Sequence, residues 1–225
     1  NPLILLGIYT FVFSVIFQVR FGGKAGFGQS ALYIFCGMVP WMAFHEAVGR
    51  STGILIDNAN LIKKVMFPSK ILPMYIVLSH GVNLLIGFGI LVAAVLLSGR
   101  ALSPWLLLLP LFLFAQLLLT LGACWLASTV NVFLRDSAQV INQLLIIVMY
   151  LSPIFYSVSM VPETVRRYAY LNPMVGLIEG YRDILLNGTA PSLGGLAYFS
   201  VVAAALFLLG YFVFNRNQHT FADVL

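Results

Sequence analysis

Six long stretches of this chain contain no Asp, Glu, Lys or Arg. They are Asn1–Val19, Ala25–His45, Ile71–Gly99, Ala101–Leu134, Ser137–Pro162 and Ile184–Asn215. About 20 mostly apolar residues cross a bilayer as a helix. Because the backbone in lipid must satisfy its own hydrogen bonds, such segments form helices rather than open strands. The pattern predicts an all-α membrane protein with six transmembrane helices.

The composition agrees with a membrane location. Of 225 residues, 61% are hydrophobic and 8% are charged, whereas a soluble domain averages about 25% charged residues. This excludes a water-soluble globule and indicates one transmembrane domain over residues 1–225. The net charge of +5 is better explained by membrane anchoring than by nucleic-acid binding.

The bounds of the transmembrane helices can be predicted from the charge-free stretches and from the residues that interrupt them. We predict helices at Pro2–Val19, Ser30–Val48, Ile71–Leu97, Trp105–Val132, Ser137–Tyr156 and Leu196–Phe214. With a cytoplasmic N-terminus and the long fifth loop set aside, basic residues favour the cytoplasmic joints, as the positive-inside rule expects. The joint between helices two and three is then cytoplasmic.

That first cytoplasmic joint contains a short amphipathic pattern over Asp57–Phe67. Leu61, Ile62, Val65 and Met66 share one face by helical spacing, and Pro68 ends the pattern. Such a helix either lies on lipid headgroups or docks in a groove of a partner protein. Of these two, a helix at the membrane surface is in general the commoner.

The fifth joint, Ser157–Gly195, is too apolar for a free loop and too interrupted for a transmembrane helix. Asn172–Pro173 divides it, because the residue before a proline avoids the helical region. We expect two short helices, Pro162–Leu171 and Met174–Leu186, forming a re-entrant pair. A loop lying on the surface is the alternative. Glu179 and Arg182 are placed to pair on one helix face.

Few residues in the helices carry chemistry. Glu46 is the only carboxylate near a helix interior, and we expect Arg50, at i+4, to neutralise it. His45 and His80 are isolated in sequence and are expected to pack or hydrogen-bond. No phosphate-binding loop, catalytic motif or metal-ligand spacing is present. We therefore expect no catalytic residue and no metal site, and any ATP hydrolysis must occur on another chain.

Aromatic residues recur along helix one and around the outer end of helix five. Aromatic faces suit the apolar faces of sugars, so they are candidates for lining a glycan path; interfacial belts and helix packing are the alternative. The candidates are Tyr9, Phe13, Phe17, Tyr150, Phe155, Tyr156, Tyr168 and Tyr170.

Several ordered segments together resemble a known family. They are Asn60–Pro68 followed by Ile71-Leu72-Pro73, Arg135-Asp136, Ser152–Tyr156, Pro162, Asn172-Pro173 and Arg182, with Phe11–Phe17 in the first helix. This set resembles ABC-2 type permeases, in the branch that exports O-antigen, teichoic acid and related polysaccharides. The similarity extends over nearly the whole chain.

The resemblance implies a homodimer of permeases in the bacterial inner membrane, paired with two ATPase subunits that bind ATP and Mg²⁺, with no cofactor in this chain. It implies a lipid-linked polysaccharide as substrate, a re-entrant segment containing Asn172, Pro173, Glu179 and Arg182, and an amphipathic segment preceding Asn1. It also implies that the first cytoplasmic joint is the coupling helix that contacts the ATPase. Its residues would be Asn60, Leu61, Ile62, Lys63, Lys64, Val65, Met66 and Phe67.

Other functions remain open at this point. An ABC-2 exporter of a small hydrophobic compound or lipid would share the architecture. A membrane-embedded enzyme acting on lipid-linked substrates would need a cluster of acid, base or metal ligands, and only His45, Glu46 and Arg50 come near one. A structural subunit would tolerate replacement of Lys63, Lys64 and Tyr156.

Overall fold

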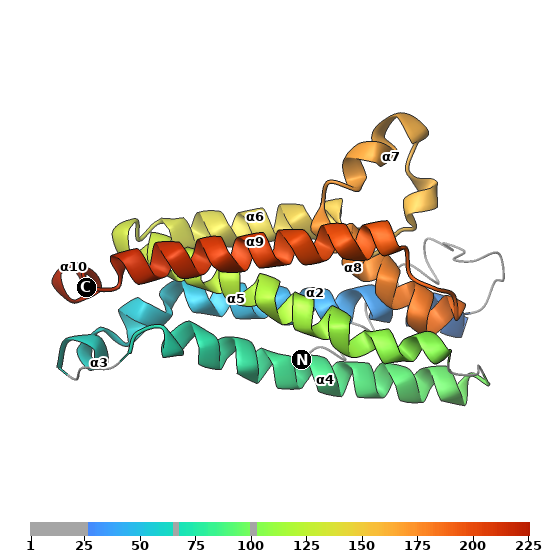
Figure 1. Cartoon of the computed structure of the whole chain (residues 1–225), viewed down its shortest axis with the longest axis horizontal. Helices are drawn as coiled ribbons and strands as arrows, with labels where there is room; N and C mark the ends of the chain where they lie inside the picture. The colour runs from blue at the N-terminus through green and yellow to red at the C-terminus, as the bar shows by residue number, and fades with distance from the viewer. Residues whose placement is uncertain (1–26, 65–67, 100–102) are drawn as a thin grey trace. The chain divides into compact units, whose positions relative to one another are not determined.

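The structure is a computed structural model that describes residues 27–64, 68–99 and 103–225. Within these ranges every regular element is a helix (Figure 1). The all-α prediction is therefore confirmed for the described part of the chain. The predicted first helix, Pro2–Val19, lies outside the described residues, as do Tyr9, Phe13 and Phe17.

Four helical segments of the described residues have the length and apolar composition needed to cross a membrane. They are α2 (Phe27–Asp57), α4 (Ile71–Leu97), η2 (Pro104–Leu108) running into α5 (Leu109–Phe133), and α9 (Leu193–Asn217). A fifth apolar helix, α6 (Ser137–Leu151), has 15 residues and reaches about 22 Å, shorter than the hydrocarbon core. The predicted bounds of α4 are confirmed.

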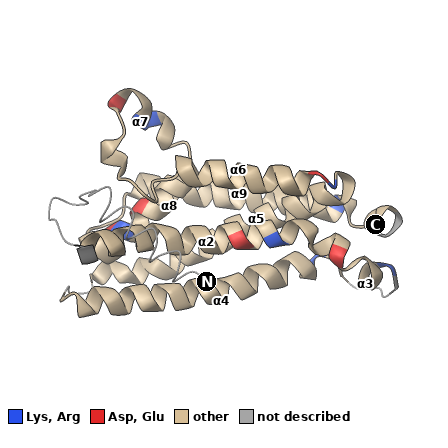
Figure 2. Cartoon of the chain, turned by 180° about the vertical axis from the view of Figure 1, so that it is seen from behind, with Lys and Arg blue, Asp and Glu red and all other residues tan. Residues whose placement is uncertain are grey.

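Six further helical segments of the described residues are short. They are α3 (Ala59–Lys64), η3 (Val158–Met160), α7 (Glu163–Ala169), α8 (Pro173–Arg182), the π-helical turn η4 (Asp183–Asn187) and α10 (Phe221–Val224). Charged positions are sparse along the long helices and more frequent on these short ones and their connections (Figure 2).

Two predicted boundaries are wrong. Helix two was expected to end at Val48, where charges mark the membrane exit, but α2 continues to Asp57, because a helix needs no lipid to keep its hydrogen bonds. Helix five was expected to reach Tyr156, but α6 ends at Leu151. Pro153 explains this end, since a proline removes a donor and restricts the residue before it.

The described chain divides into two compact units. The first, here called the α8 unit, comprises residues 27–42, 84–99, 103–113 and 148–199. Tyr181 of α8 is fully buried, with ring centroids 4.5 Å from Phe88 and 5.6 Å from Phe112. Gly180 lets this contact form, because a Cβ there would overlap the Phe112 ring. The core of the unit is thus built around α8.

The second, here called the α3 unit, comprises residues 43–64, 68–83, 114–147 and 200–225. Its α5 and α9 approach backbone to backbone at Gly122 and Gly210, where a side chain at either position would strike the facing helix. Small residues at such crossings are typical of membrane helices. Beside this crossing, the Trp125 ring lies 5.4 Å from Phe207 and 6.3 Å from Phe214.

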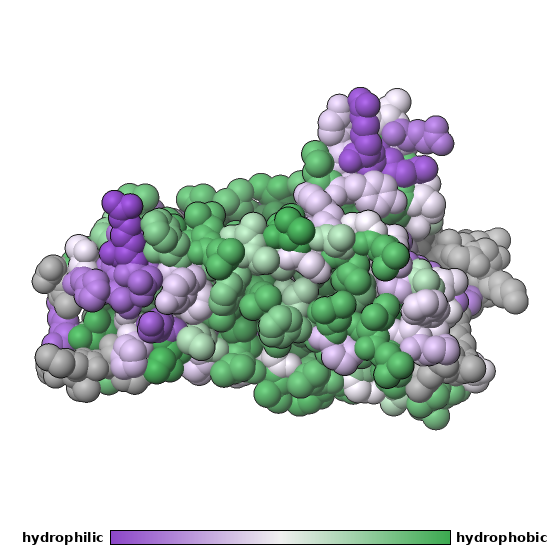
Figure 3. All heavy atoms as spheres, in the orientation of Figure 1, coloured by the Kyte–Doolittle hydropathy of each residue, from purple (hydrophilic) through white to green (hydrophobic). Residues whose placement is uncertain are grey.

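Large apolar side chains cover much of the exposed surface (Figure 3). Leu78 is 65% exposed, Leu97 89% and Leu208 63%. In water such extended apolar surface would drive association, whereas lipid tails cover it without cost. The chain is therefore a multi-pass membrane protein.

Candidate functional site

The segment between α6 and α9 is organised by Asn172. Its side-chain oxygen accepts a hydrogen bond from the backbone N–H of Met174 at 3.0 Å, which caps α8, and Pro173 occupies the first turn. Its amide nitrogen donates to Ser152 Oγ at 3.0 Å, in the turn that ends α6. The predicted division at Asn172–Pro173 is confirmed, and the same residue ties the two helix breaks together.

Arg182, the last residue of α8, is almost completely buried, at 1% exposure. Nη1 pairs with Glu179 Oε1 at 3.0 Å, which confirms the predicted pair. Nη2 donates to the carbonyl oxygen of Ile154 at 3.0 Å, and the guanidinium lies 3.6 Å from the centroid of the Tyr33 ring. We call this set, Arg182, Glu179, Tyr33 and Ile154, the Arg182 junction.

The junction joins three segments: α2, the turn after α6, and α8. Gly37 of α2 makes room for it, because a Cβ there would lie 3.1 Å from Arg182 Nη2 and 3.2 Å from Ile154 Cα. A buried guanidinium is costly unless it is paired and hydrogen-bonded. The Glu179 carboxylate, the carbonyl oxygens of Ile154 and Tyr33 and the Tyr33 ring offset the charge, while Nε makes no hydrogen bond to a described residue. The junction therefore sets where α8 lies.

Asp183 follows Arg182 directly in the chain. Its Oδ1 accepts a hydrogen bond from Asn187 Nδ2 at 3.0 Å, within the π-helical turn η4.

The aromatic candidates of the α8 unit differ in exposure. Tyr150 on α6 is 66% exposed, and Tyr168 and Tyr170, on and just after α7, are 56% and 53% exposed. Tyr156 is half-buried and donates to the Leu151 carbonyl at 3.0 Å. Phe155 is buried at 7% exposure, so in this structure its ring belongs to the core and not to an open surface.

The coupling-helix candidates Asn60, Leu61, Ile62, Lys63 and Lys64 lie on α3. Val65, Met66 and Phe67 fall outside the described residues. Asn58 forms the turn between α2 and α3: its backbone carbonyl accepts from the N–H groups of Leu61 and Ile62 at 3.0 and 3.2 Å. Lys63 is exposed and makes no ion pair within the described ranges.

The C-terminal helix α10 supports α3. The two short helices contact each other. Phe221 of α10 is fully buried, with its ring 5.2 Å from Phe214 and 6.3 Å from Phe133. The extension of α2 before α3 is also held, because Asn131 of α5 donates to the Thr52 carbonyl at 2.9 Å. The contacts of Asn131, Phe221 and the Asn58 turn together form a packed base for α3.

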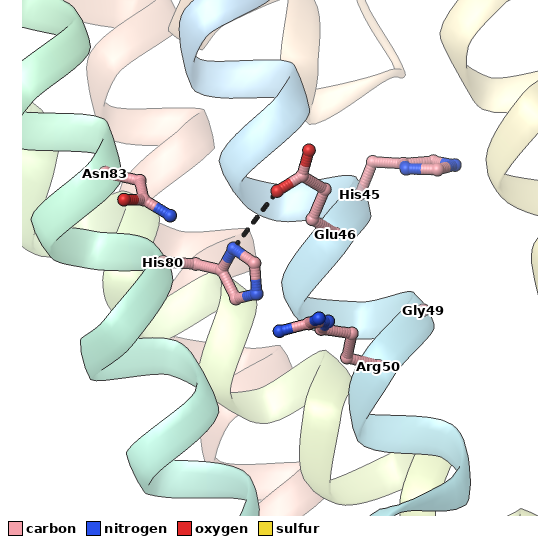
Figure 4. A pocket seen from close by; sticks show the side chains of 6 residues that line it. All are labelled: His45, Glu46, Gly49, Arg50, His80 and Asn83. Atoms are coloured by element: carbon pink, nitrogen blue, oxygen red, sulfur yellow. Dashed lines mark ion pairs between the residues drawn. The ribbon is translucent and has the colours of Figure 1, made fainter. Parts of the chain in front are cut away.

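The predicted partner of Glu46 is wrong. Glu46 Oε2 lies 3.3 Å from Nδ1 of His80, and no ion pair joins it to Arg50 in the described structure. His80, which is isolated in sequence and was expected to pack or hydrogen-bond, is brought to α2 by the packing of α4 (Figure 4). These residues line a cavity of about 440 Å³ together with His45, Gly49 and Asn83. Because 34 residues separate Glu46 from His80, residue spacing along one helix could not predict this pair.

Other contacts were also missed by sequence reasoning. Nothing in the chain marks Tyr33 or the Ile154 carbonyl as partners of Arg182, or Phe221 as support for α3. One signal was available: Arg182 is a charge in a mostly apolar helix, and such a charge requires a partner.

Comparison with known proteins decides the family. The model of the ABC-2 type transporter family matches residues 1–186. The chain belongs to the ABC-2 type transporter family. It is therefore the membrane subunit of a transporter, and the family as a whole works with an ATPase partner.

Two relatives extend the match along the full chain of this ABC-2 protein. It is 28% identical over 229 residues to the O-antigen export system permease protein RfbA of Klebsiella pneumoniae, covering 100% of this chain and 85% of the relative. It is 25% identical over 229 residues to the protein of the same name from Myxococcus xanthus, covering 99% and 84%.

Proposed function

We propose that this chain is the permease subunit of an ATP-driven exporter that moves a lipid-linked, O-antigen-like polysaccharide across the bacterial inner membrane. The observation that carries the proposal is the match of 99–100% of this chain to two proteins named as O-antigen export permeases. The extended apolar surface supports the membrane location. The chain works without an ATPase site of its own, so ATP and Mg²⁺ bind to the partner.

The proposed architecture has six transmembrane helices: one within Pro2–Val19, then α2, α4, η2–α5, α6 with the turn after it, and α9. Between the last two, α7 and α8 form a re-entrant pair. The burial of α8 supports this, since Met174, Leu177, Ile178, Tyr181 and Arg182 are all buried. A half-helix enclosed by protein is tolerated at membrane depth.

In this proposal α3 is the coupling helix. Two copies of the permease form a homodimer, and α3 of each copy docks in one of two ATPase subunits. Residues Asn60–Phe67 supply the contact, with exposed Lys63 available to a partner's acidic groups. The base formed by Asn131, Phe221 and the Asn58 turn supports this role. Because its contacts are packed and hydrogen-bonded, a displacement of α3 would be transmitted to α2 and α5.

The glycan path is proposed to run between protomers, lined by aromatics of helix one and by exposed tyrosines near α6 and α7. Tyr150, Tyr168 and Tyr170 remain accessible. Each sugar–aromatic contact is worth about 1 kcal/mol, weak enough for a long polymer to slide past. Phe155 is buried, so in this proposal it supports the path without lining it.

The deciding experiment tests assembly and export together in cells whose own O-antigen permease is deleted. We expect the chain, expressed with its companion ATPase, to co-purify with it and to restore surface polysaccharide. Lys63→Glu with Lys64→Glu should abolish both. The matched control, Arg135→Glu with Arg216→Glu, reverses two exposed charges outside α3 and should leave both intact.

Loss of co-purification in the control pair, or normal export by the Lys63/Lys64 variant, would remove the coupling assignment. Assembly with the ATPase but no polysaccharide at the surface, with a small hydrophobic compound exported instead, would replace the substrate.

A further inference from the structure

The cavity between α2 and α4 has a charge arrangement that neither helix needs for packing. Glu46 and Arg50 lie one turn apart on α2, and the imidazole of His80 lies between the carboxylate and the guanidinium (Figure 4). His45 points to the other side of α2 in the same view. A carboxylate and a guanidinium thus share one open pocket with no ion pair between them in the described structure.

The polar atoms of the pocket are not saturated. The His80 side chain is 7% exposed, and its Nδ1 makes no hydrogen bond although Glu46 is at ion-pair distance. The Glu46 side chain is 40% exposed, and Arg50 is exposed with no ion pair to a described residue. A buried nitrogen that makes no hydrogen bond, beside two accessible charges, indicates a ligand that carries polar groups.

The depth of the pocket in the membrane narrows the choice of ligand. α2 and α4 have 31 and 27 residues, so they span about 46 and 40 Å, more than the roughly 30 Å hydrocarbon core. Counted from the helix ends remote from α3, Glu46 lies at about 28 Å and His80 at about 26 Å. No polar side chain occurs between Leu84 and Leu97. The pocket therefore lies near the headgroup level of the leaflet on the α3 side.

We propose that this pocket binds the headgroup of a zwitterionic phospholipid with a primary ammonium, as in phosphatidylethanolamine. The phosphate binds Arg50 and His80, and the ammonium binds Glu46, with Asn83 adding a hydrogen bond. A purely anionic headgroup would meet the Glu46 carboxylate, and a cation would meet Arg50. Side chains at i and i+4 are neighbours on a helix, which suits charges joined by the short ethanolamine link.

The consequence is a lipid contact on the two helices that flank α3. The lipid headgroup would add a link between α2 and α4 beside the Glu46–His80 pair. This lipid site is distinct from the proposed glycan path and does not depend on what the protein exports.

The test is lipid binding by the purified full-length permease in detergent, followed by native mass spectrometry. The probes are dioleoyl phosphatidylethanolamine, phosphatidylcholine and phosphatidylglycerol at equal mole fraction, with undecaprenyl diphosphate as a fourth arm. We expect phosphatidylethanolamine to bind about threefold or more above the other three, the scale of one accessible ion pair. Phosphatidylcholine tests the ammonium hydrogen bond, because its quaternary nitrogen has no donor.

Substitutions of Glu46 and Arg50 test which part of the lipid headgroup each charge binds. Glu46→Gln should bring phosphatidylethanolamine down to the level of phosphatidylcholine, and Arg50→Gln should weaken all phospholipids, with Arg50→Lys restoring binding. Glu163→Gln and Arg216→Gln, matched changes at exposed positions, should have no effect. Equal binding of the three phospholipids, a preference for the diphosphate, or equal losses in the matched controls would overturn the proposal.

Discussion

At the scale of single residues, Arg182 carries the strongest constraint in the described chain. Its charge is buried, and each partner comes from a different stretch of sequence: Glu179 from its own helix, Ile154 from the turn after α6, and Tyr33 from α2. Breaking such a pair from one side leaves the remaining groups buried and unpaired, which costs more than the pair contributes.

Replacing Arg182 should therefore destabilise the protein. We expect Arg182→Met to lower the free energy of unfolding by about 3 kcal/mol, and Arg182→Lys to recover only part of this, because lysine cannot reach the carboxylate and a carbonyl in one plane. Thermal unfolding in detergent, followed by size-exclusion chromatography, measures both. Arg167→Lys, at an exposed position, is the control. Wild-type stability of Arg182→Lys would show that the fork geometry is unimportant.

The second prediction at this scale concerns Gly37. A Cβ there meets Arg182 Nη2 at 3.1 Å and the Ile154 backbone at 3.2 Å, so Gly37→Ala should cost about 1–2 kcal/mol of stability. Gly89→Ala is the matched change, because nothing lies within 4 Å of a Cβ at that position in α4. It should be neutral or stabilising by up to about 1 kcal/mol. Equal unfolding temperatures of the two variants would contradict the close approach.

At the scale of elements, α3 and α10 depend on each other. A helix of six residues is too short to be stable alone in water, so its order comes from its neighbours. The Asn58 turn holds its start, and α10 contacts it from the C-terminal end of the chain.

Removing the Phe221 ring should loosen this base. Phe221 is fully buried, so Phe221→Ala should cost about 3 kcal/mol, and amide hydrogen exchange over residues 59–64 should accelerate. Val224→Ala, at a partly exposed position of the same helix, should change exchange little. If residues 59–64 keep wild-type protection in Phe221→Ala, α10 does not support α3.

At the scale of the whole molecule, the question is which ends of the helices face which side of the membrane. The two native cysteines, Cys36 and Cys124, are buried, so we expect neither to react with a thiol-labelling reagent. Burial also keeps a charged reagent away from either thiol. Single cysteines placed at exposed positions therefore report topology without removing the native ones.

We expect Glu163→Cys on α7 to react with a membrane-impermeant maleimide from outside intact spheroplasts. Asn60→Cys on α3 should react only after permeabilisation. Wild-type protein, with its two native thiols, is the background. Labelling of both positions from the same side would contradict the cytoplasmic assignment of α3 or the outward assignment of α7.

The sequence alone determined the helical class, the span of α4, the break at Asn172–Pro173 and the Glu179–Arg182 pair. These follow from local physics: charge-free length, the backbone restriction imposed by proline, and helical spacing. The continuation of α2 to Asp57 and the early end of α6 were not predicted, because charges mark a membrane boundary rather than a helix boundary and because the charge-free run continues past Pro153.

Only the tertiary structure decided that His80 rather than Arg50 faces Glu46, that Tyr33 and Ile154 surround Arg182, and that Phe221 supports α3. In each case the partners are separated by tens of residues or more. Their distance depends on how helices pack, which is set by many weak contacts summed over whole faces, and no local pattern in the chain records that sum.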